Sequence, residues 1–231
     1  MIKSFLKKIE YLSRINWIKS AYYYIVIGRS CEDKKSIRKA SVCMGGGSKI
    51  FVGKCNLYTT KDNAILFSHP KASLLLGVHT NVPTPTVLSM FENAKMIVGK
   101  HVMINRGTKV VLHKGGTLEM GDNSYINENS RIHCAKHISI CANCAIAWNV
   151  TIMDTDIHKI YRDGKWVNED AEVIIGNNVW IGAHCMVLKG AIIEDNCIIA
   201  AHSVVRGHLK ANTIYGGNPL KEISRFDYWE I

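Results

Sequence analysis

Isoleucine or valine recurs at every sixth position between residues 175 and 205, a spacing that fits neither an α-helix nor an ordinary strand. A helix repeats its apolar face about every 3.6 residues and a strand about every two. A fixed short period instead predicts a solenoid, because each coil of a solenoid buries its apolar residue only by stacking on the next coil. The repeating positions are Ile175, Ile181, Val187, Ile193, Ile199 and Val205.

A second position of the repeat, four residues after each of the first five anchors, carries a small or thin side chain. The residue directly after an anchor is often glycine, alanine or acidic. Each repeat thus directs one bulky and one small side chain inward. This pattern predicts a short strand followed by a corner. The small positions are Val179, Cys185, Ala191, Cys197 and Ser203.

The same phase appears earlier in three registers separated by short slips, which predicts one continuous coil with insertions at its corners. Its anchors are Val98, Ile104, Val110, Met120, Ile126, Ile132, Ile140, Ile146 and Ile152. Farther upstream the pattern is less regular. Apolar runs at residues 65–67 and 74–76 predict strands, and we interpret residues 50–95 as irregular first coils with an insertion at Pro83 and Pro85.

The repeat breaks once over a long distance, between Ile152 and Ile175, where the spacing is 23 residues instead of six. About 17 residues therefore leave the coil, within the segment MDTDIHKIYRDGKWVNEDAEV. A long loop in a repetitive scaffold is usually functional or disordered, and the aromatic residues Tyr161 and Trp166 argue against disorder. We expect the loop to span residues 153–172 and to form part of an active site.

This loop contains one histidine, His158, close to two carboxylates, Asp154 and Asp156. An imidazole with an ordinary pKa near 6.5 can accept a proton from a hydroxyl at neutral pH, which makes it the usual general base in acyl transfer. Either aspartate is a candidate for orienting the ring. A solvent-exposed loop histidine without function is the alternative. The loop has no cysteine, which argues against an acyl-enzyme intermediate.

The net charge of +10 is concentrated near the N-terminus, where residues 1–39 hold ten Lys or Arg against three acids. Residues Ile2 to Ile18 place apolar side chains on one helical face with lysines elsewhere. We expect a helical, basic segment over residues 1–44 and the coil over residues 45–231, with a C-terminal tail at 211–231. The helix is expected to pack on the end of the solenoid, and peripheral contact with an anionic membrane stays open as the alternative.

Several classes of protein fit the composition poorly. No apolar segment reaches the roughly 18 to 20 residues of a membrane span, and no convincing signal peptide is present, so we expect a cytoplasmic protein. Three of the eight cysteines, Cys144, Cys185 and Cys197, occupy the small inward position and are expected to be reduced core thiols. The basic N-terminus lacks interleaved aromatic residues, so we expect no nucleic-acid partner.

Ten histidines make a zinc site worth weighing, since His133 and His137 lie close to Cys134, Cys141 and Cys144. A catalytic zinc requires converging ligands and an open position for water. The inward position of Cys144 makes this arrangement unfavourable. We therefore expect no metal requirement, and we keep a zinc-dependent hydratase and a non-catalytic β-solenoid scaffold as alternatives.

The run IIGNNVWIGAHCMVLKGAIIEDNCIIAAHSVV resembles the hexapeptide-repeat acyltransferases, in particular sugar O-acetyltransferases of the maltose and galactoside type. The resemblance covers roughly residues 95 to 225. It implies a mainly β fold, a left-handed parallel β-helix, with the N-terminal helical segment and the extruded active-site loop added to it. It also implies acetyl-CoA as the acyl donor and a homotrimer with each active site between adjacent subunits.

The resemblance assigns roles to particular residues. His158 precedes the IGNNVWIG motif at Ile175–Gly182 by the interval typical of the catalytic histidine, although Lys159 stands where the family commonly has proline. Asn127 is the best match to an asparagine that helps place the acceptor sugar, with Asn129 second. The cofactor-binding positions are Trp180 near the thiol, Ala183 and Ala201 along the pantetheine, Arg206, where the family usually has threonine and lysine, and Lys221 at the nucleotide phosphates.

From these features we expect an O-acetyltransferase that moves an acetyl group from acetyl-CoA to a sugar hydroxyl by direct attack, with His158 as general base. The resemblance implies a role in bacterial surface polysaccharide biosynthesis, with a polysaccharide precursor as acceptor. Serine, an amino-sugar nitrogen and a xenobiotic hydroxyl stay open as other acceptors.

Overall fold

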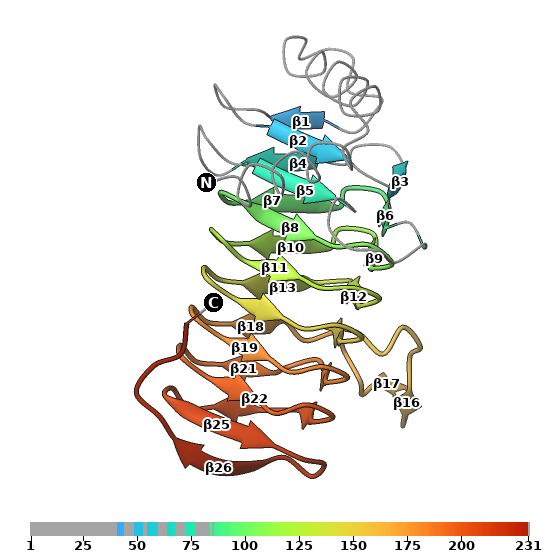
Figure 1. The fold of residues 1–231 in the computed structure, drawn as a ribbon. Helices are drawn as coiled ribbons and strands as arrows, with labels where there is room; N and C mark the ends of the chain where they lie inside the picture. The colour runs from blue at the N-terminus through green and yellow to red at the C-terminus, as the bar shows by residue number, and fades with distance from the viewer. Residues whose placement is uncertain are drawn as a thin grey trace, which may run out of the picture.

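The fold is a stack of coils whose three sides are three β-sheets of mainly parallel strands, as Figure 1 shows. The computed structural model describes residues 41–43, 49–52, 55–59, 64–67, 73–76, 84 and 86–230. The chain passes through sheets A, B and C in turn, and neighbouring strands of each sheet come from successive coils, except that the last strand (Lys221–Arg225) returns antiparallel to the one before it in sheet B. Within the described residues all regular structure is β, which confirms the prediction of a mainly β fold built as a parallel β-helix.

The strand bounds follow sheet by sheet. Sheet A contains β1 (Ser41–Cys43), β4 (Ala64–Phe67), β7 (Lys95–Val98), β10 (Thr117–Met120), β13 (His137–Ile140), β18 (Val173–Ile175), β21 (Ile192–Ile193) and β24 (His208–Leu209). Sheet B contains β2 (Lys49–Val52), β5 (Ser73–Leu76), β8 (Val102–Ile104), β11 (Tyr125–Ile126), β14 (Ala145–Ile146), β19 (Trp180–Ile181), β22 (Ile198–Ile199), β25 (Thr213–Gly216) and β26 (Lys221–Arg225). Sheet C contains β3 (Cys55–Thr59), β6 (Thr86–Met90), β9 (Lys109–Leu112), β12 (Arg131–Cys134), β15 (Thr151–Met153), β20 (Met186–Val187) and β23 (Val204–Val205).

The sixfold anchors form the core inside the three sheets. Every anchor from Val98 to Val205 is at most 2% exposed, and the five small positions are fully buried. Burying one such aliphatic side chain contributes about 1.5–3 kcal/mol, so the repeat itself supplies the main stabilisation. The thiols of Cys144 and Cys185 donate to the carbonyls of Gly176 and Ala200 at 3.0 Å. These cysteines are free and buried, as the pattern predicted.

The corners between sheets A and B turn through asparagine. Asn178 and Asn196 have φ angles of 55° and 56°, in the left-handed region that asparagine tolerates better than most residues. The amide of Asn178 donates to the Oδ1 of Asn196 on the next coil at 2.9 Å. At the corner between sheets B and C, Gly182 is required for another reason. A Cβ there would lie 2.7 Å from the backbone nitrogen of Ala201.

The register slips in the sequence all fall at one corner, the one that leads from sheet C to sheet A. Anchors Val110 and Met120 flank this corner in one coil, and Ile132 and Ile140 flank it in the next. The long gap from Ile152 to Ile175 falls there too. The extra residues are therefore added at a single edge of the column, and the loop with His158 leaves the coil at that edge.

Several predictions concern the first part of the chain. The apolar runs at 65–67 and 74–76 lie in strands β4 and β5, as predicted. Strand β1 already belongs to sheet A and falls inside the segment 1–44 that we assigned to the N-terminus. The predicted N-terminal helix, Pro83 and Pro85 lie outside the described residues. In the part of the chain that is described, no helix is long and apolar enough to cross a membrane.

Candidate active site

Residues 154–172 connect β15 of sheet C to β18 of sheet A and contain a hairpin that belongs to none of the three sheets. Its strands are β16 (Tyr161–Arg162) and β17 (Lys165–Trp166), which pair antiparallel and stand beside the column in Figure 1. The ammonium of Lys159 lies 4.3 Å from the centroid of the Trp166 ring, a cation–π contact. The segment therefore has regular structure of its own.

His158 lies in this loop, exposed and just before the hairpin. Its backbone N–H donates to the carbonyl of Asp156 at 2.7 Å, and its carbonyl accepts from the side-chain amide of Asn168 at 2.9 Å. The preceding residue, Ile157, has a φ of 65°, which is unfavourable for a β-branched side chain. The backbone around His158 is thus held in a specific and strained conformation, while its imidazole faces solvent.

Asp154 is fully buried where the loop leaves the coil. Its Oδ1 accepts the backbone N–H of Ala135 at 2.7 Å, and its Oδ2 accepts that of Lys136 at 2.8 Å. The thiol of Cys134 approaches the same Oδ2 at 3.5 Å. Both carboxylate oxygens therefore hold the corner of the preceding coil, and the structure does not bring them to the His158 ring.

Asp156 is exposed and is held by two other side chains. Its Oδ2 accepts from Nζ of Lys189 at 2.7 Å and from Nδ2 of Asn168 at 2.9 Å. The hydrogen bond from Lys189, followed by that from Asn168, lowers the pKa of the Asp156 carboxyl below its ordinary value. This aspartate is therefore a carboxylate at neutral pH, and its contacts fix the loop two residues before His158.

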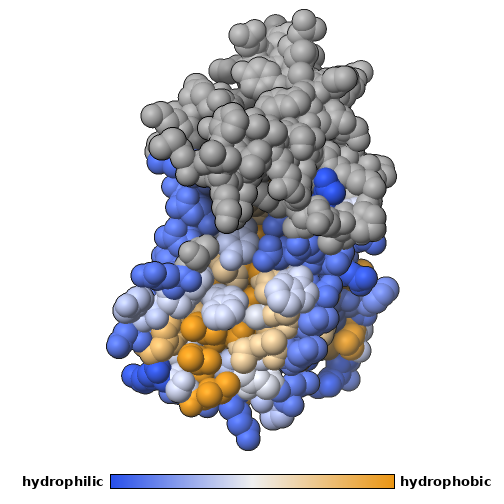
Figure 2. All heavy atoms as spheres, viewed as in Figure 1, coloured by the Kyte–Doolittle hydropathy of each residue, from blue (hydrophilic) through white to orange (hydrophobic). Residues whose placement is uncertain are grey.

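A second group of predicted site residues lies on the outer face of sheet B. Asn127 and Trp180 line a pocket of about 270 Å³, together with Tyr125, Ala145, Ala147, Trp148, Trp229 and Glu230. The Oδ1 of Asn127 accepts the side-chain amide of Asn105 at 2.8 Å, so Asn105 fixes the orientation of Asn127. Figure 2 shows that apolar side chains gather on the lower front of the molecule, over the C-terminal strands of this sheet. The pocket offers aromatic walls and a few polar groups, the usual composition of a ligand site.

The C-terminal segment forms one wall of this pocket. The rings of Trp180 and Trp229 have centroids 5.9 Å apart, and Nε1 of Trp229 donates to the carbonyl of Asn178 at 2.8 Å. The amide of Asn196 donates to the carbonyl of Asp227 at 2.8 Å. The tail therefore runs back along the asparagine corner and ends over the pocket.

Ala183 and Ala201 lie on adjacent coils at the corner between sheets B and C, directly beside the pocket strands. The backbone N–H of His202 donates to the carbonyl of Ala183 at 2.9 Å, which fixes the stacking of these two corners. Ala201 is exposed and Ala183 is half-buried. Small side chains at this edge leave backbone groups open to an extended ligand.

The two basic residues predicted to bind the cofactor, Arg206 and Lys221, lie apart from each other. Arg206 is at the corner from sheet C to sheet A, near enough to Asp156 to lower the pKa of its carboxyl further. Lys221 is exposed at the start of β26, at the C-terminal end of sheet B. The structure therefore brings Asn127, Trp180, Ala183 and Ala201 together on one side, whereas Arg206 lies with the His158 loop.

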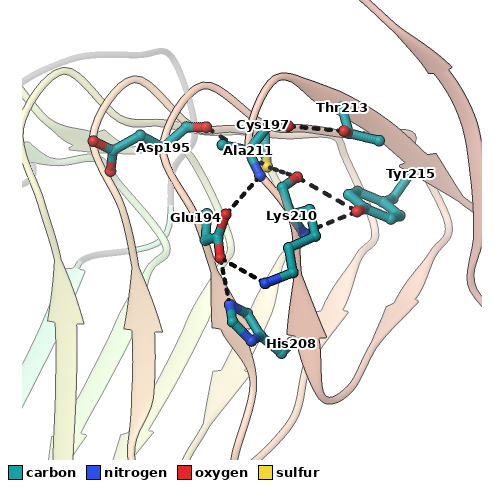
Figure 3. Close-up of polar contacts among 8 residues, drawn as sticks. All are labelled: Glu194, Asp195, Cys197, His208, Lys210, Ala211, Thr213 and Tyr215. Carbon is teal, nitrogen blue, oxygen red and sulfur yellow. Dashed lines mark hydrogen bonds and ion pairs between the residues drawn. The ribbon is translucent and has the colours of Figure 1, made fainter.

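Two further basic side chains near the end of the column, His208 and Lys210, share one carboxylate. Figure 3 shows Glu194 between His208 and Lys210, with its Oε1 2.7 Å from Nε2 of His208 and 3.3 Å from Nζ of Lys210. Its Oε2 accepts the backbone N–H of Ala211 at 2.9 Å. That bond, followed by those from the lysine and the histidine, lowers the pKa of the Glu194 carboxyl. His208 and Lys210 thus pair with a carboxylate that remains charged.

Burial determines the protonation state of the thiols inside the coil. Burial raises the pKa of the Cys144 and Cys197 thiols to about 11, so both stay protonated at neutral pH. Burial also raises the pKa of Cys134, which lies close to His133 and His137 in sequence. Among the described residues no three histidine, cysteine or acidic side chains converge as metal ligands.

Sequence reasoning missed four residues that shape these sites: Asn168, Lys189, Trp148 and Trp229. The roles of Asn168 and Lys189 depend on how the loop folds back on the coil, which no repeat period encodes. Trp148 follows an anchor at a corner where small residues prevail in the later coils, and that departure was visible in the sequence. Trp229 lies beyond the repeat, and only the path of the tail brings it to Trp180.

Known proteins resemble both the repeat and the fold. Residues 172–207 match the family described as Bacterial transferase hexapeptide (six repeats). The galactoside O-acetyltransferase of Escherichia coli (strain K12) is 34% identical over 138 residues, which are 58% of this chain and 66% of that protein. The polysialic acid O-acetyltransferase of Neisseria meningitidis is 30% identical over 122 residues, 51% of this chain and 56% of that protein. The chain thus spans between about half and two thirds of the length of these curated relatives.

A solved structure extends the similarity over most of the fold. The polysialic acid O-acetyltransferase OatWY superposes with a TM-score of 0.59 at 26% sequence identity, covering 83% of this chain and 91% of that one. The six-residue period, the three-sided coil and the sequence similarity agree with one another. Residues 172–207 therefore carry the hexapeptide repeat described for bacterial transferases, and most of the chain is similar in fold to a polysialic acid O-acetyltransferase.

Proposed function

We propose that this protein transfers an acetyl group from acetyl-CoA to a hydroxyl of a sugar, with His158 as the general base. The observation that carries the proposal is the position of His158, which is exposed on a structured loop that leaves the coil at one edge. The relatives named above act on galactosides and on polysialic acid, which favours a carbohydrate acceptor. A surface polysaccharide or its precursor is therefore the acceptor class that we propose.

In the proposed reaction a nitrogen of the His158 imidazole accepts the proton of the sugar hydroxyl as its oxygen attacks the thioester carbonyl carbon. The tetrahedral intermediate then collapses, the carbon–sulfur bond breaks, and the imidazolium returns its proton to the departing CoA sulfur. Backbone N–H groups near the Trp180 corner are the proposed donors to the oxyanion, an interaction often worth about 3 kcal/mol. The buried, protonated thiols take no part, in keeping with direct attack.

The proposed site is shared between two copies of the chain. His158 lies at the edge from sheet C to sheet A, whereas Asn127 and Trp180 lie on the outer face of sheet B. A loop that projects from one edge can reach the sheet-B face of a neighbouring copy in a closed ring. We therefore propose a homotrimer in which each active site takes His158 from one copy and the sheet-B pocket from the next.

The corner with Ala183 and Ala201 is the proposed track for the pantetheine arm of acetyl-CoA, since its backbone groups are reachable past small side chains. Lys221 is the proposed contact for the nucleotide phosphates, because it is exposed at the C-terminal end of sheet B, the sheet that leads into the corner with Ala183 and Ala201. Arg206 lies beside the His158 loop of its own copy. In the proposed trimer this loop faces the sheet-B pocket of the next copy, so Arg206 would contact a phosphate of the acetyl-CoA bound there. Because acetyl-CoA is made in the cytoplasm, we place the reaction there.

Calorimetric titration with acetyl-CoA and with non-reactive desulfo-CoA tests the donor, and acetylation of galactosides and sialic acid oligomers tests the acceptor. We expect micromolar binding of both CoA compounds at one site per chain. His158→Ala should lower kcat by about 100-fold or more without weakening CoA binding, as expected for loss of a general base. The matched control His208→Ala removes another exposed histidine and should keep full turnover. Near wild-type turnover of the His158→Ala enzyme would refute the mechanism.

A further inference from the structure

The side chain of Asn168 uses its full hydrogen-bonding capacity on the loop that carries His158. Its Oδ1 accepts the backbone N–H of Ile160 at 2.6 Å and Nε1–H of Trp166 at 2.9 Å. Its Nδ2 donates to Oδ2 of Asp156 and to the carbonyl of His158, each at 2.9 Å. A primary amide has two donor hydrogens and two acceptor lone pairs, and all four are used here.

Lys189 ties the same loop to the coil. It lies at the corner between β20 and β21, on the coil after the one that the loop leaves. Its ammonium donates to Oδ2 of Asp156 at 2.7 Å and to the carbonyls of Asn168 and Glu169 at 2.8 and 3.1 Å. An ammonium has three hydrogens to donate, so this lysine too is saturated. Asp156, Asn168 and Lys189 form one network, which we name the loop clasp.

The clasp holds the chain before, at and after His158, and none of its hydrogen bonds is to the imidazole ring. It holds the residue two positions before the histidine, the histidine carbonyl itself and the amide two positions after it. No partner among the described residues holds the imidazole, so the backbone determines where the ring lies. Ile157 has a left-handed φ of 65°, and a strained backbone of this kind persists only where its surroundings enforce it.

We infer that Asn168 and Lys189 are positioning residues that fix the backbone of the His158 loop and so place the imidazole for proton transfer. This inference rests on the proposed function for its catalytic consequence, whereas the ordering of the loop can be tested without any substrate. A general base must lie within hydrogen-bonding distance of the proton it removes, and a misplacement of about 1 Å can cost about 100-fold in rate.

The sharpest variant is Asn168→Asp, which keeps the shape but replaces the donor amide by a second carboxylate oxygen. That oxygen faces the Asp156 carboxylate and the His158 carbonyl, so two attractive contacts become repulsive. Lys189→Met removes the side-chain link from the clasp to the coil and leaves the loop's own bonds in place. The matched controls are Asn143→Asp, an exposed corner asparagine on another edge, and Lys114→Met, which removes only an exposed ion pair with Glu92.

Two measurements on the full-length protein test the inference. Hydrogen exchange of the amides at residues 157–161 should accelerate at least tenfold in Asn168→Asp and Lys189→Met and stay at the wild-type rate in both controls. With an acceptor identified as above, kcat should fall at least tenfold while KM for acetyl-CoA stays within twofold. If these residues served only the stability of the coil, the variants would show neither the faster exchange confined to residues 157–161 nor the fall in kcat at unchanged KM.

The outcomes separate the clasp from the proposed reaction. Wild-type exchange rates in both clasp variants would overturn the inference whether or not the protein is an acetyltransferase. Faster exchange with unchanged kcat would overturn the positioning role while leaving the reaction intact. A wild-type protein that neither binds acetyl-CoA nor transfers acetyl groups would refute the proposed function, and the exchange data would still decide whether the clasp orders the loop.

Discussion

Replacing Asp154 by asparagine should destabilise the coil, because this aspartate holds a corner of the coil and does not orient the His158 ring. The carboxylate is fully buried, and each oxygen accepts one backbone N–H, from Ala135 at 2.7 Å and from Lys136 at 2.8 Å. In Asp154→Asn one oxygen becomes an NH₂ group that faces an N–H donor. One charge-assisted bond is lost, and a buried donor is left without an acceptor.

Hydrogen bonds to charged groups contribute about 1.5–3 kcal/mol each, so Asp154→Asn should cost about 2 kcal/mol and Asp154→Ala, which removes both acceptors, about 4 kcal/mol. In a protein of this size about 1 kcal/mol corresponds to roughly 2–4 °C in Tm. We therefore expect Tm to fall by about 4–8 °C in the asparagine variant. Asp156→Asn affects an exposed ion pair and should change the free energy of unfolding by at most about 1 kcal/mol.

Differential scanning calorimetry and urea unfolding of the three variants measure these changes, and the pH profile of acetyl transfer separates a structural from a catalytic role. The expected pattern is a lower Tm in both Asp154 variants with the pH optimum unchanged. A Tm within about 1 °C of wild type in Asp154→Ala, together with a lost or shifted pH profile, would contradict the assignment of this aspartate to the corner.

Two further predictions concern the core and the loop. Ile181→Ala should lower the free energy of unfolding, measured with urea, by about 2–5 kcal/mol because the side chain of Ile181 is fully buried. Ile192→Ala, at a position 41% exposed, should lower it by less than about 1 kcal/mol. Equal losses in the two variants would contradict the assignment of Ile181 to the core. The contribution of the Asp156 carboxylate to loop order should be fully present above the unfolded pKa of about 3.9 and be lost as pH falls through its lowered folded pKa. A pH titration of tryptophan fluorescence should therefore show a transition below about pH 4 that is missing in Asp156→Asn, and an identical titration of both proteins would count against it.

The sequence predicts the coil well because one physical rule generates it. A solenoid interior has the same neighbours in every turn, so the same inward position must be apolar in each repeat. Ile175, Ile181 and Val187 follow this rule in three successive sheets, and all are fully buried. The cysteines at the small position follow it as well, and their thiols reach carbonyls of the next coil.

The loop obeys no such rule, and its internal contacts were therefore beyond the repeat pattern. Asp154 and Asp156 are two residues apart and chemically identical, yet one is buried in the corner and the other is exposed in the clasp. Sequence proximity to His158 suggested the same role for both. Only the path of the chain separates them, because Asp154 is the last residue at the coil edge and Asp156 already belongs to the loop.

The edge between sheets C and A explains why the coil can carry this loop without losing its core. All the register slips fall at this edge, so insertions of two, four or about 17 residues leave the anchors of the three sheets in stacking order. A buried Asp154 closes the corner on one side of the insertion, and Lys189 on the next coil holds its far end. The chemistry of the loop can therefore vary while the coil stays fixed. The strained backbone at Ile157 is held by the buried Thr155, whose Oγ1 accepts the Ile157 N–H at 2.9 Å, and by the clasp beyond it.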